Sequence, residues 1–272
     1  MATDSVTIIG LENAVPQPGR RRDGLELAIG FSLILLVIWT PRPWQRVLYC
    51  LAATFLIVVT CSSFESTRAM GLRTANLLRS LWLVGLAVVV ASAVLLVAER
   101  MKTLHPGDVN GVGAFFTRYW GYALWAFAQQ ILLQDFFLRR TLRLVSRPGI
   151  AVLLSAGVFS IAHLPNPILT LITFFWGVIA CSVFLRYRNL YPLWLTHALL
   201  GITIAVSVPG PMIRNMRVGL GYLTYVQHDS GYRQRRAPDP QRRQPHGLQR
   251  NQADQTVSTR AWVKAEAPTR RS

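Results

Sequence analysis

Residues 81–98 read LWLVGLAVVVASAVLLVA, an unbroken apolar run without a charged side chain. A hydrocarbon core of about 30 Å is crossed by a helix of roughly 17 to 25 apolar residues. Lipid offers the backbone no hydrogen-bond partner, so a spanning segment must be a helix or part of a closed barrel. The apolar residues here are continuous rather than alternating, which excludes a barrel strand. The run therefore predicts a membrane-spanning helix.

The rest of the chain repeats this pattern, and its composition of 51% hydrophobic and 15% charged residues is typical of a membrane protein. We predict about seven spans, within a range of roughly six to eight. The predicted spans are 24–40, 47–64, 81–98, 119–138, 149–163, 167–185 and 190–208. The predicted fold class is an all-α, polytopic transmembrane helix bundle, and the predicted location is the cell membrane.

The net charge of +17 does not indicate a nucleic-acid partner, because much of it lies in the tail from Arg233 onward and most of the rest in short loops. Lys and Arg in short loops mark the cytoplasmic side of a membrane. One side of the predicted bundle collects the arginines at positions 20–22, 68, 73, 79, 139, 140, 143, 147, 186 and 188. We therefore place the N-terminal segment, residues 1–23, in the cytoplasm. The basic tail, residues 227–272, has few apolar residues and is predicted to be disordered.

Ionisable side chains in a membrane helix are costly, roughly 2.5 to 3.5 kcal/mol for a central Asp or Arg, so each needs a reason. The first such place is the segment 134–139, Gln-Asp-Phe-Phe-Leu-Arg. Asp135 and Arg139 are four residues apart, so on a helix they share a face and can neutralise each other. The alternative is a structural ion pair near the interface, with Arg139, Arg140 and Arg143 extending outward.

Two histidines mark the other polar places. His163 ends the stretch Phe159-Ser160-Ile161-Ala162-His163, and it can act as a general base, position a water, bind a metal or simply cap the helix end. His197 lies about 10 Å deep in the last span, where a histidine needs a partner; its alternative role is helix packing. Because His163 falls late in its span and His197 early in its own, a common depth requires a shifted or kinked fifth helix.

These three places together predict one polar cluster in the bundle interior, because they come from three different helices. Asp135, His163 and His197 can activate a water molecule. Two histidines and a carboxylate are also a ligand set for a divalent metal such as zinc. The sequence leaves a metal-bound and a metal-free site open, and it establishes no cofactor.

At these residues the chain resembles the CPBP family of intramembrane proteases, which includes CAAX prenyl endoproteases and Abi-like bacterial proteins. The family pattern is Glu-Glu-x-x-x-Arg, then Phe-x-x-x-His, then His-x-x-x-Asn on successive helices. The matching stretches are Gln134-Asp135-x-x-x-Arg139, Phe159-x-x-x-His163 and His197-x-x-x-Gly201. The resemblance implies catalytic roles at Gln134, Asp135, Arg139, His163 and His197, and substrate-binding roles at Phe159 and Gly201.

The resemblance also implies a domain organisation and a reaction. Residues 24–118 become N-terminal transmembrane helices, and residues 119–226 become a CPBP-like intramembrane protease core. The implied function is an endopeptidase that cuts near the C terminus of a prenylated or hydrophobic-tailed protein at the lipid bilayer. Our hypothesis is that Asp135, oriented by Arg139, and His163 polarise a water, while His197 donates a hydrogen bond to the developing oxyanion.

Two positions depart from the family pattern. Gln134 cannot serve as a carboxylate base, so Asp135, with a side chain one methylene shorter than glutamate, would have to do so. Gly201 lacks the amide donor of the family asparagine. The alternative function is therefore a catalytically impaired CPBP-like membrane protein that acts as a binding or assembly scaffold.

Overall fold

The computed structural model describes residues 19–74, 76–104 and 112–225, all within the compact unit Met1–Val226. Every regular element in these residues is a helix, so the all-α expectation is confirmed for the part of the chain that the structure describes. The predicted disordered tail, residues 227–272, and most of the predicted cytoplasmic segment, residues 1–23, lie outside the described residues.

Each predicted span coincides with a helix, although the ends differ by several residues. The elements are α1 (Arg20–Trp39), α2 (Trp44–Ser62), α3 (Leu77–Arg100), α4 (Val112–Ile131), η2 (Leu132–Leu138), α5 (Arg139–Leu144), α6 (Pro148–Ile161), α7 (Pro167–Tyr187), α8 (Leu190–Ser207), α9 (Gly210–Ile213) and η3 (Arg214–Met216), followed by a helical stretch at 219–225. The largest difference concerns the predicted span 119–138, which begins earlier and ends in η2, a π-helix. Such segments are rare and frequently occur at functional sites.

Four of these helices, α2, α3, α7 and α8, are long and apolar enough to cross a membrane. α6 is apolar but has only 14 residues. α1 and the α4–η2 segment carry more charged and amide side chains, and neither meets the same measure. The chain is therefore a membrane protein, whereas the count of about seven spans remains a prediction.

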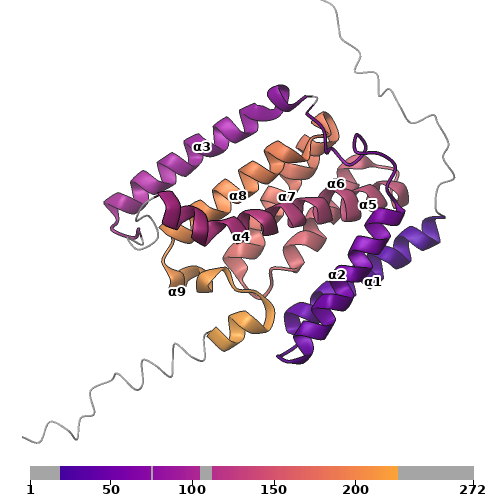
Figure 1. The fold of residues 1–272 in the computed structure, drawn as a ribbon, viewed down its shortest axis with the longest axis horizontal. Helices are drawn as coiled ribbons and strands as arrows, with labels where there is room; N and C mark the ends of the chain where they lie inside the picture. Colours follow the sequence, from indigo (N-terminus) through magenta and orange to yellow (C-terminus); the bar gives the residue numbers. More distant parts are fainter. Residues whose placement is uncertain (1–18, 75, 105–111, 226–272) are drawn as a thin grey trace, which may run out of the picture. The chain divides into compact units, whose positions relative to one another are not determined.

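The helices pack in pairs around η2. α6 lies against α7, α3 and α4 both lie against α8, and α1 lies against α2 (Figure 1). η2 contacts α2, α4, α5, α6 and α7. Small side chains permit close approach in a membrane bundle: a Cβ on Gly177 of α7 would lie 3.0 Å from the Cβ of Ala156 on α6. The bundle is thus built around the segment that carries Gln134 and Asp135.

An apolar core surrounds η2 and holds it in place. Its buried members come from α3, η2, α6, α7 and α8, and they are Leu83, Leu133, Leu138, Val152, Phe159, Trp176, Ala180, Cys181, Phe184, Leu190 and Leu193. In lipid the hydrophobic effect contributes little between helices, so the fit of side chains supplies most of the association energy. η2 therefore cannot rotate without opening this core.

A buried ion network fastens α5 to α1 and α2. Arg140 is fully buried, and its Nε donates to Oε2 of Glu26 at 2.8 Å. Its other nitrogens donate to the Ser63 hydroxyl and to backbone carbonyls of η2 and α2. Arg143 donates to both carboxylate oxygens of Asp23. The interpretation in which Arg140 and Arg143 extend outward is therefore wrong, because each finds a carboxylate inside the bundle and makes charge-assisted hydrogen bonds there.

The loops that follow α2 and α7 lie together, and both belong to the arginine-rich side that the sequence assigned to the cytoplasm. Nδ2 of Asn189 donates to the carbonyl of Arg73 at 3.0 Å, and the Leu190 N–H donates to the carbonyl of Gly71 at 3.0 Å. Arg73 in turn donates to the carbonyl of Arg188 at 3.3 Å. These contacts place the two loops at one end of the helices, and the orientation of that end in the membrane remains a prediction.

Gly30 of α1 provides a test of this packing. A Cβ at Gly30 would lie 2.5 Å from Cζ of Phe136, whose ring centroid lies only 4.4 Å from the guanidinium carbon of buried Arg140. We expect Gly30→Ala to lower the free energy of unfolding by about 1–3 kcal/mol, because the ring cannot move aside freely. Thermal unfolding in detergent measures the change.

Gly24 on the same helix is the matched control, since a Cβ there would meet no atom within 4 Å. Gly24→Ala should leave stability unchanged or raise it by up to about 1 kcal/mol through helix propensity. Equal effects of the two substitutions would contradict the close contact between α1 and η2.

Candidate active site

His197 lies inside α8, and a buried row of two amides holds its ring. Nε2 of Gln130 lies 2.9 Å from Nδ1 of His197, and Nε2 of Gln134 donates to Oε1 of Gln130 at 3.4 Å. Both glutamines are fully buried, and His197 is 9% exposed. Because the Gln130 amide donates to Nδ1, the proton of the neutral imidazole is on Nε2. His197 therefore presents an N–H donor from Nε2.

Gln130 was not among the predicted site residues, although the sequence holds a signal for it. Gln130 and Gln134 are four residues apart on the continuous α4–η2 segment, so they share a face. A buried amide inside an apolar span is costly unless it is hydrogen-bonded. Two amides at this spacing beside Asp135 indicate a hydrogen-bonded row rather than isolated polar residues.

His163 has the opposite arrangement of protons. It lies in the turn that follows α6, and its Nδ1 is 2.8 Å from the carbonyl oxygen of Phe159. A carbonyl oxygen can only accept, so Nδ1 carries the proton and Nε2 keeps its lone pair. Nε2 of His163 can therefore accept a proton, whereas Nε2 of His197 can donate one in a hydrogen bond.

The ring of Phe159 connects the two histidines. Its centroid lies 5.0 Å from that of His163 and 6.3 Å from that of His197, both in edge-to-face geometry. His163 follows Ile161, the last residue of α6, and the bond from Nδ1 turns its ring back toward Phe159 one turn earlier. The structure thus brings His163, Phe159 and His197 together. The common depth of His163 and His197 in the membrane remains a prediction.

Asp135 and Arg139 form the ion pair that their spacing indicates, but only loosely. Nη1 of Arg139 is 3.9 Å from Oδ1 of Asp135, and the same guanidinium pairs with Glu65 at 2.5 Å. Asp135 is 3% exposed, and neither of its carboxylate oxygens has a hydrogen-bond partner among the described residues. In that part of the chain, no hydrogen bond joins Asp135 to His163 or His197.

Three more buried polar atoms without a hydrogen-bond partner within the described residues belong to the amide row, to a ring beside His197 and to its neighbour in sequence. They are Oε1 of Gln134, Nε1 of Trp176 and Oγ1 of Thr196. Folded proteins leave few such atoms, because each costs about 1–3 kcal/mol. Gln134 belongs to the amide row, the Trp176 ring lies 5.8 Å from the His197 ring, and Thr196 precedes His197 in α8. Each of these unpaired atoms can bind a water molecule or a polar group of a peptide.

Gly201 is buried one turn after His197 on α8, against Tyr122 of α4. A Cβ at Gly201 would lie 1.8 Å from the Tyr122 hydroxyl oxygen. The position at which the CPBP pattern has an asparagine is therefore filled by a hydroxyl from another helix. Sequence reasoning missed Tyr122, because nothing in the local sequence links it to a residue so far along the chain.

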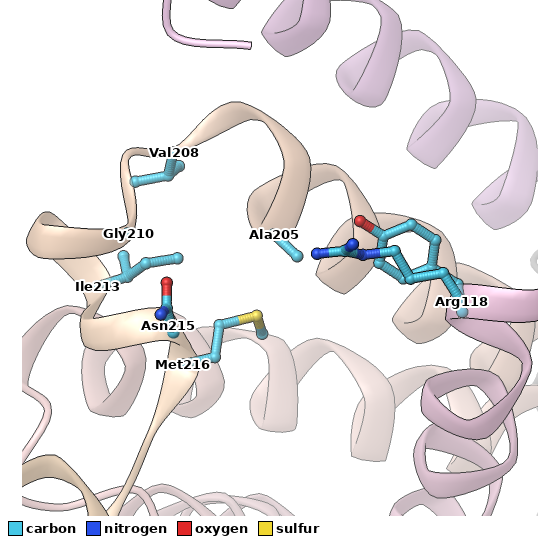
Figure 2. Close-up of a pocket in the computed structure, with 8 residues that line it drawn as sticks. Arg118, Ala205, Val208, Gly210, Ile213, Asn215 and Met216 are labelled. Carbon is cyan, nitrogen blue, oxygen red and sulfur yellow. The ribbon is translucent and has the colours of Figure 1, made fainter. Parts of the chain in front are cut away.

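A cavity of about 340 Å³ lies further along α4 and α8. Its lining comes from α4, from α8 and from the segment that follows: Arg118, Tyr119, Ala205, Val208, Gly210, Ile213, Asn215 and Met216. Figure 2 shows the Arg118 side chain extending toward Ala205. Eight residues separate Ala205 from His197, about 12 Å along the helix at 1.5 Å per residue. An extended peptide of about three or four residues covers that distance.

The described residues do not bring together three or more His, Cys, Asp or Glu side chains as a group that could hold a metal ion. Zinc sites in proteins ordinarily use three or four such ligands. A metal at Asp135, His163 and His197 therefore stays an untested prediction, and the chemistry below is derived from the side chains alone.

Comparison with known families shows what the central part of the chain is similar to. Residues 81–203 match the family model described as type II CAAX prenyl endopeptidase Rce1-like. This segment, a little under half of the chain, is similar to the Rce1-like CAAX proteases. Comparisons with curated proteins and with solved structures gave no match. The expected resemblance to the CAAX proteases, a family of hydrolases, is confirmed.

The Rce1-like segment contains all three motifs and more of the bundle than the motifs alone indicate. It begins in α3, which packs along α8, and it ends within α8 after Gly201. The match thus starts before residue 119, where the predicted protease core begins. The family model includes most of α3, and α3 packs against α8, the helix that carries His197.

His163 and His197 should carry opposite tautomers. In protein labelled with nitrogen-15 histidine in lipid nanodiscs, we expect His197 to be protonated on Nε2 and His163 on Nδ1. Gln130→Leu removes the donor to His197 and should populate both His197 tautomers while leaving His163 unchanged. The same tautomer at both histidines in the wild-type protein would contradict this arrangement of the site.

Proposed function

We propose that this Rce1-like protein is a multi-pass endopeptidase of the cell membrane that hydrolyses a peptide bond near the C terminus of a prenylated or hydrophobic-tailed protein. The observation that carries the proposal is the pairing of two histidines of opposite tautomer around Phe159. One offers a lone pair and the other an N–H group. A base and an oxyanion donor are the two groups that peptide hydrolysis requires most.

In the proposed reaction, a water oxygen bonds to the carbonyl carbon of the scissile peptide while Nε2 of His163 takes one water proton. The carbonyl oxygen becomes an oxyanion and accepts a hydrogen bond from Nε2–H of His197. The carbon–nitrogen bond then breaks, and the His163 imidazolium returns its proton to the leaving amine. One water is consumed, and the products are a new carboxyl group and a new amine.

Asp135 polarises the attacking water in this proposal, and Arg139 orients it. The two oxygens of Asp135 are buried without a partner among the described residues, so they can accept hydrogen bonds from a water. Gln134 is an amide and cannot take a proton at neutral pH; its role is to orient Gln130, which orients His197. In this proposal His163, whose Nε2 keeps its lone pair, is the proton acceptor, and Asp135 only accepts a hydrogen bond from the water.

The cavity beyond Gly201 supports a hydrophobic C-terminal peptide as the substrate. Four apolar side chains line it, and Arg118 stands at its edge: the apolar ones are Ala205, Val208, Ile213 and Met216. Apolar pockets with a few convergent polar groups are typical ligand sites. A cut made beside His197 would leave about three or four residues to occupy the space as far as Ala205.

Substitution of either histidine should abolish cleavage. We expect His163→Ala and His197→Ala each to lower kcat/KM at least about 100-fold, because one removes the base and the other the oxyanion donor. The assay uses protein in liposomes and an internally quenched peptide with an S-farnesyl cysteine fourth from its C terminus. The rise in fluorescence measures cleavage of the peptide.

Cys50→Ala and Cys61→Ala are the controls, since both cysteines are exposed on α2, and their rates should equal that of the wild type. Full activity of both histidine variants would contradict the protease assignment. That result would leave the scaffold alternative, which the amide at Gln134 and the missing side chain at Gly201 favour.

A further inference from the structure

Tyr122 and Gly201 form a matched pair across the contact between α4 and α8. A Cβ at Gly201 would lie 1.8 Å from the hydroxyl oxygen, 2.6 Å from Cζ and 2.8 Å from Cε1 of Tyr122. No side chain other than hydrogen fits beside that ring. The absence of a side chain at Gly201 therefore leaves room for the Tyr122 hydroxyl at the surface of α8.

The pair lies between the two functional features of the same helices. Gly201 follows His197 by one turn, about 6 Å along α8, and Ala205 at the cavity follows by another turn. On α4, Tyr122 comes one turn after Arg118 at the cavity and two turns before Gln130, which holds His197. A peptide that extends from the cavity to His197 must pass the Tyr122 hydroxyl.

The Tyr122 hydroxyl is a hydrogen-bond donor that has no role in the reaction described above. Among the described residues the hydroxyl makes no hydrogen bond, and the Tyr122 side chain is half-buried, so this donor is open to a bound molecule. It comes from a different helix than the Nε2–H of His197 and reaches α8 one turn away. Two donors that approach from separate directions can bind the two lone pairs of one oxyanion.

We propose that Tyr122 is a further catalytic residue, whose hydroxyl donates a second hydrogen bond to the oxyanion beside His197. This inference rests on the proposed function. It supplies the donor that position 201 lacks, through a residue on another helix. It also makes the glycine at 201 a requirement of the site rather than a loss.

Tyr122→Phe removes the hydroxyl and keeps the ring that packs on Gly201. With the farnesylated peptide in liposomes, we expect kcat to fall about 100-fold with KM little changed, the loss typical of one oxyanion donor. Tyr49→Phe is the matched control, because this tyrosine is 53% exposed on α2, and its rate should stay at the wild-type value.

The double variant Tyr122→Ala with Gly201→Asn separates chemistry from packing. Removal of the ring makes room for a side chain at 201, and the new amide restores a donor one turn from His197. We expect at least a tenfold higher kcat than for Tyr122→Ala alone. If Tyr122→Phe also lowers the melting temperature, the comparison of the double variant with Tyr122→Ala decides between chemistry and packing. Recovery of kcat in the double variant supports the oxyanion role, and no recovery overturns it.

The outcomes also distinguish this inference from the proposed function. Full activity of Tyr122→Phe, with His163→Ala and His197→Ala inactive, would overturn the role of Tyr122 and leave the protease standing. A wild-type protein that leaves the peptide intact would overturn both.

Discussion

Every polar side chain inside this bundle needs a hydrogen-bond or ion-pair partner, because the apolar surroundings offer none. This constraint is satisfied in one region of the molecule and only partly satisfied in another. Where α5 meets α1 and α2, the constraint is satisfied: Arg140 and Arg143 pair with Glu26 and Asp23 and donate to backbone carbonyls as well. Removing one partner of such a buried pair strands the other charge and costs about 3–5 kcal/mol. These ion pairs and hydrogen bonds hold α1 and α2 against α5.

On η2 and around His197 the same constraint is left partly unmet. The two amides are hydrogen-bonded to each other and to His197. Within the described residues, however, Oε1 of Gln134, Nε1 of Trp176 and both carboxylate oxygens of Asp135 have no hydrogen-bond partner. Stability is lost in this way where function needs open donors and acceptors. The π-helix η2 places Gln134 and Asp135 in the middle of the bundle, and the apolar core keeps it from turning them elsewhere.

The apolar runs were sufficient to predict the helices, because a run such as residues 81–98 has few alternatives in lipid. The pairing of Asp135 with Arg139 followed from their spacing. Other features depend on contacts between distant segments, which one sequence does not display. Gln130 reaches His197, Tyr122 fills the space of Gly201, and Arg140 turns inward to Glu26, each across a helix interface. The π-helix was also beyond pattern rules, because its hydrogen bonds depend on how the neighbouring helices confine it.

The central claim is that water, activated at His163, cleaves a peptide beside His197. It is tested most directly by cleavage of the farnesylated peptide in oxygen-18 water by purified protein, followed by mass spectrometry of both fragments. The account predicts a single heavy oxygen in the new carboxyl group of the fragment that ends in the farnesylated cysteine, and no such fragment with His163→Ala. An intact peptide, or the same labelled fragment from His163→Ala, would contradict it.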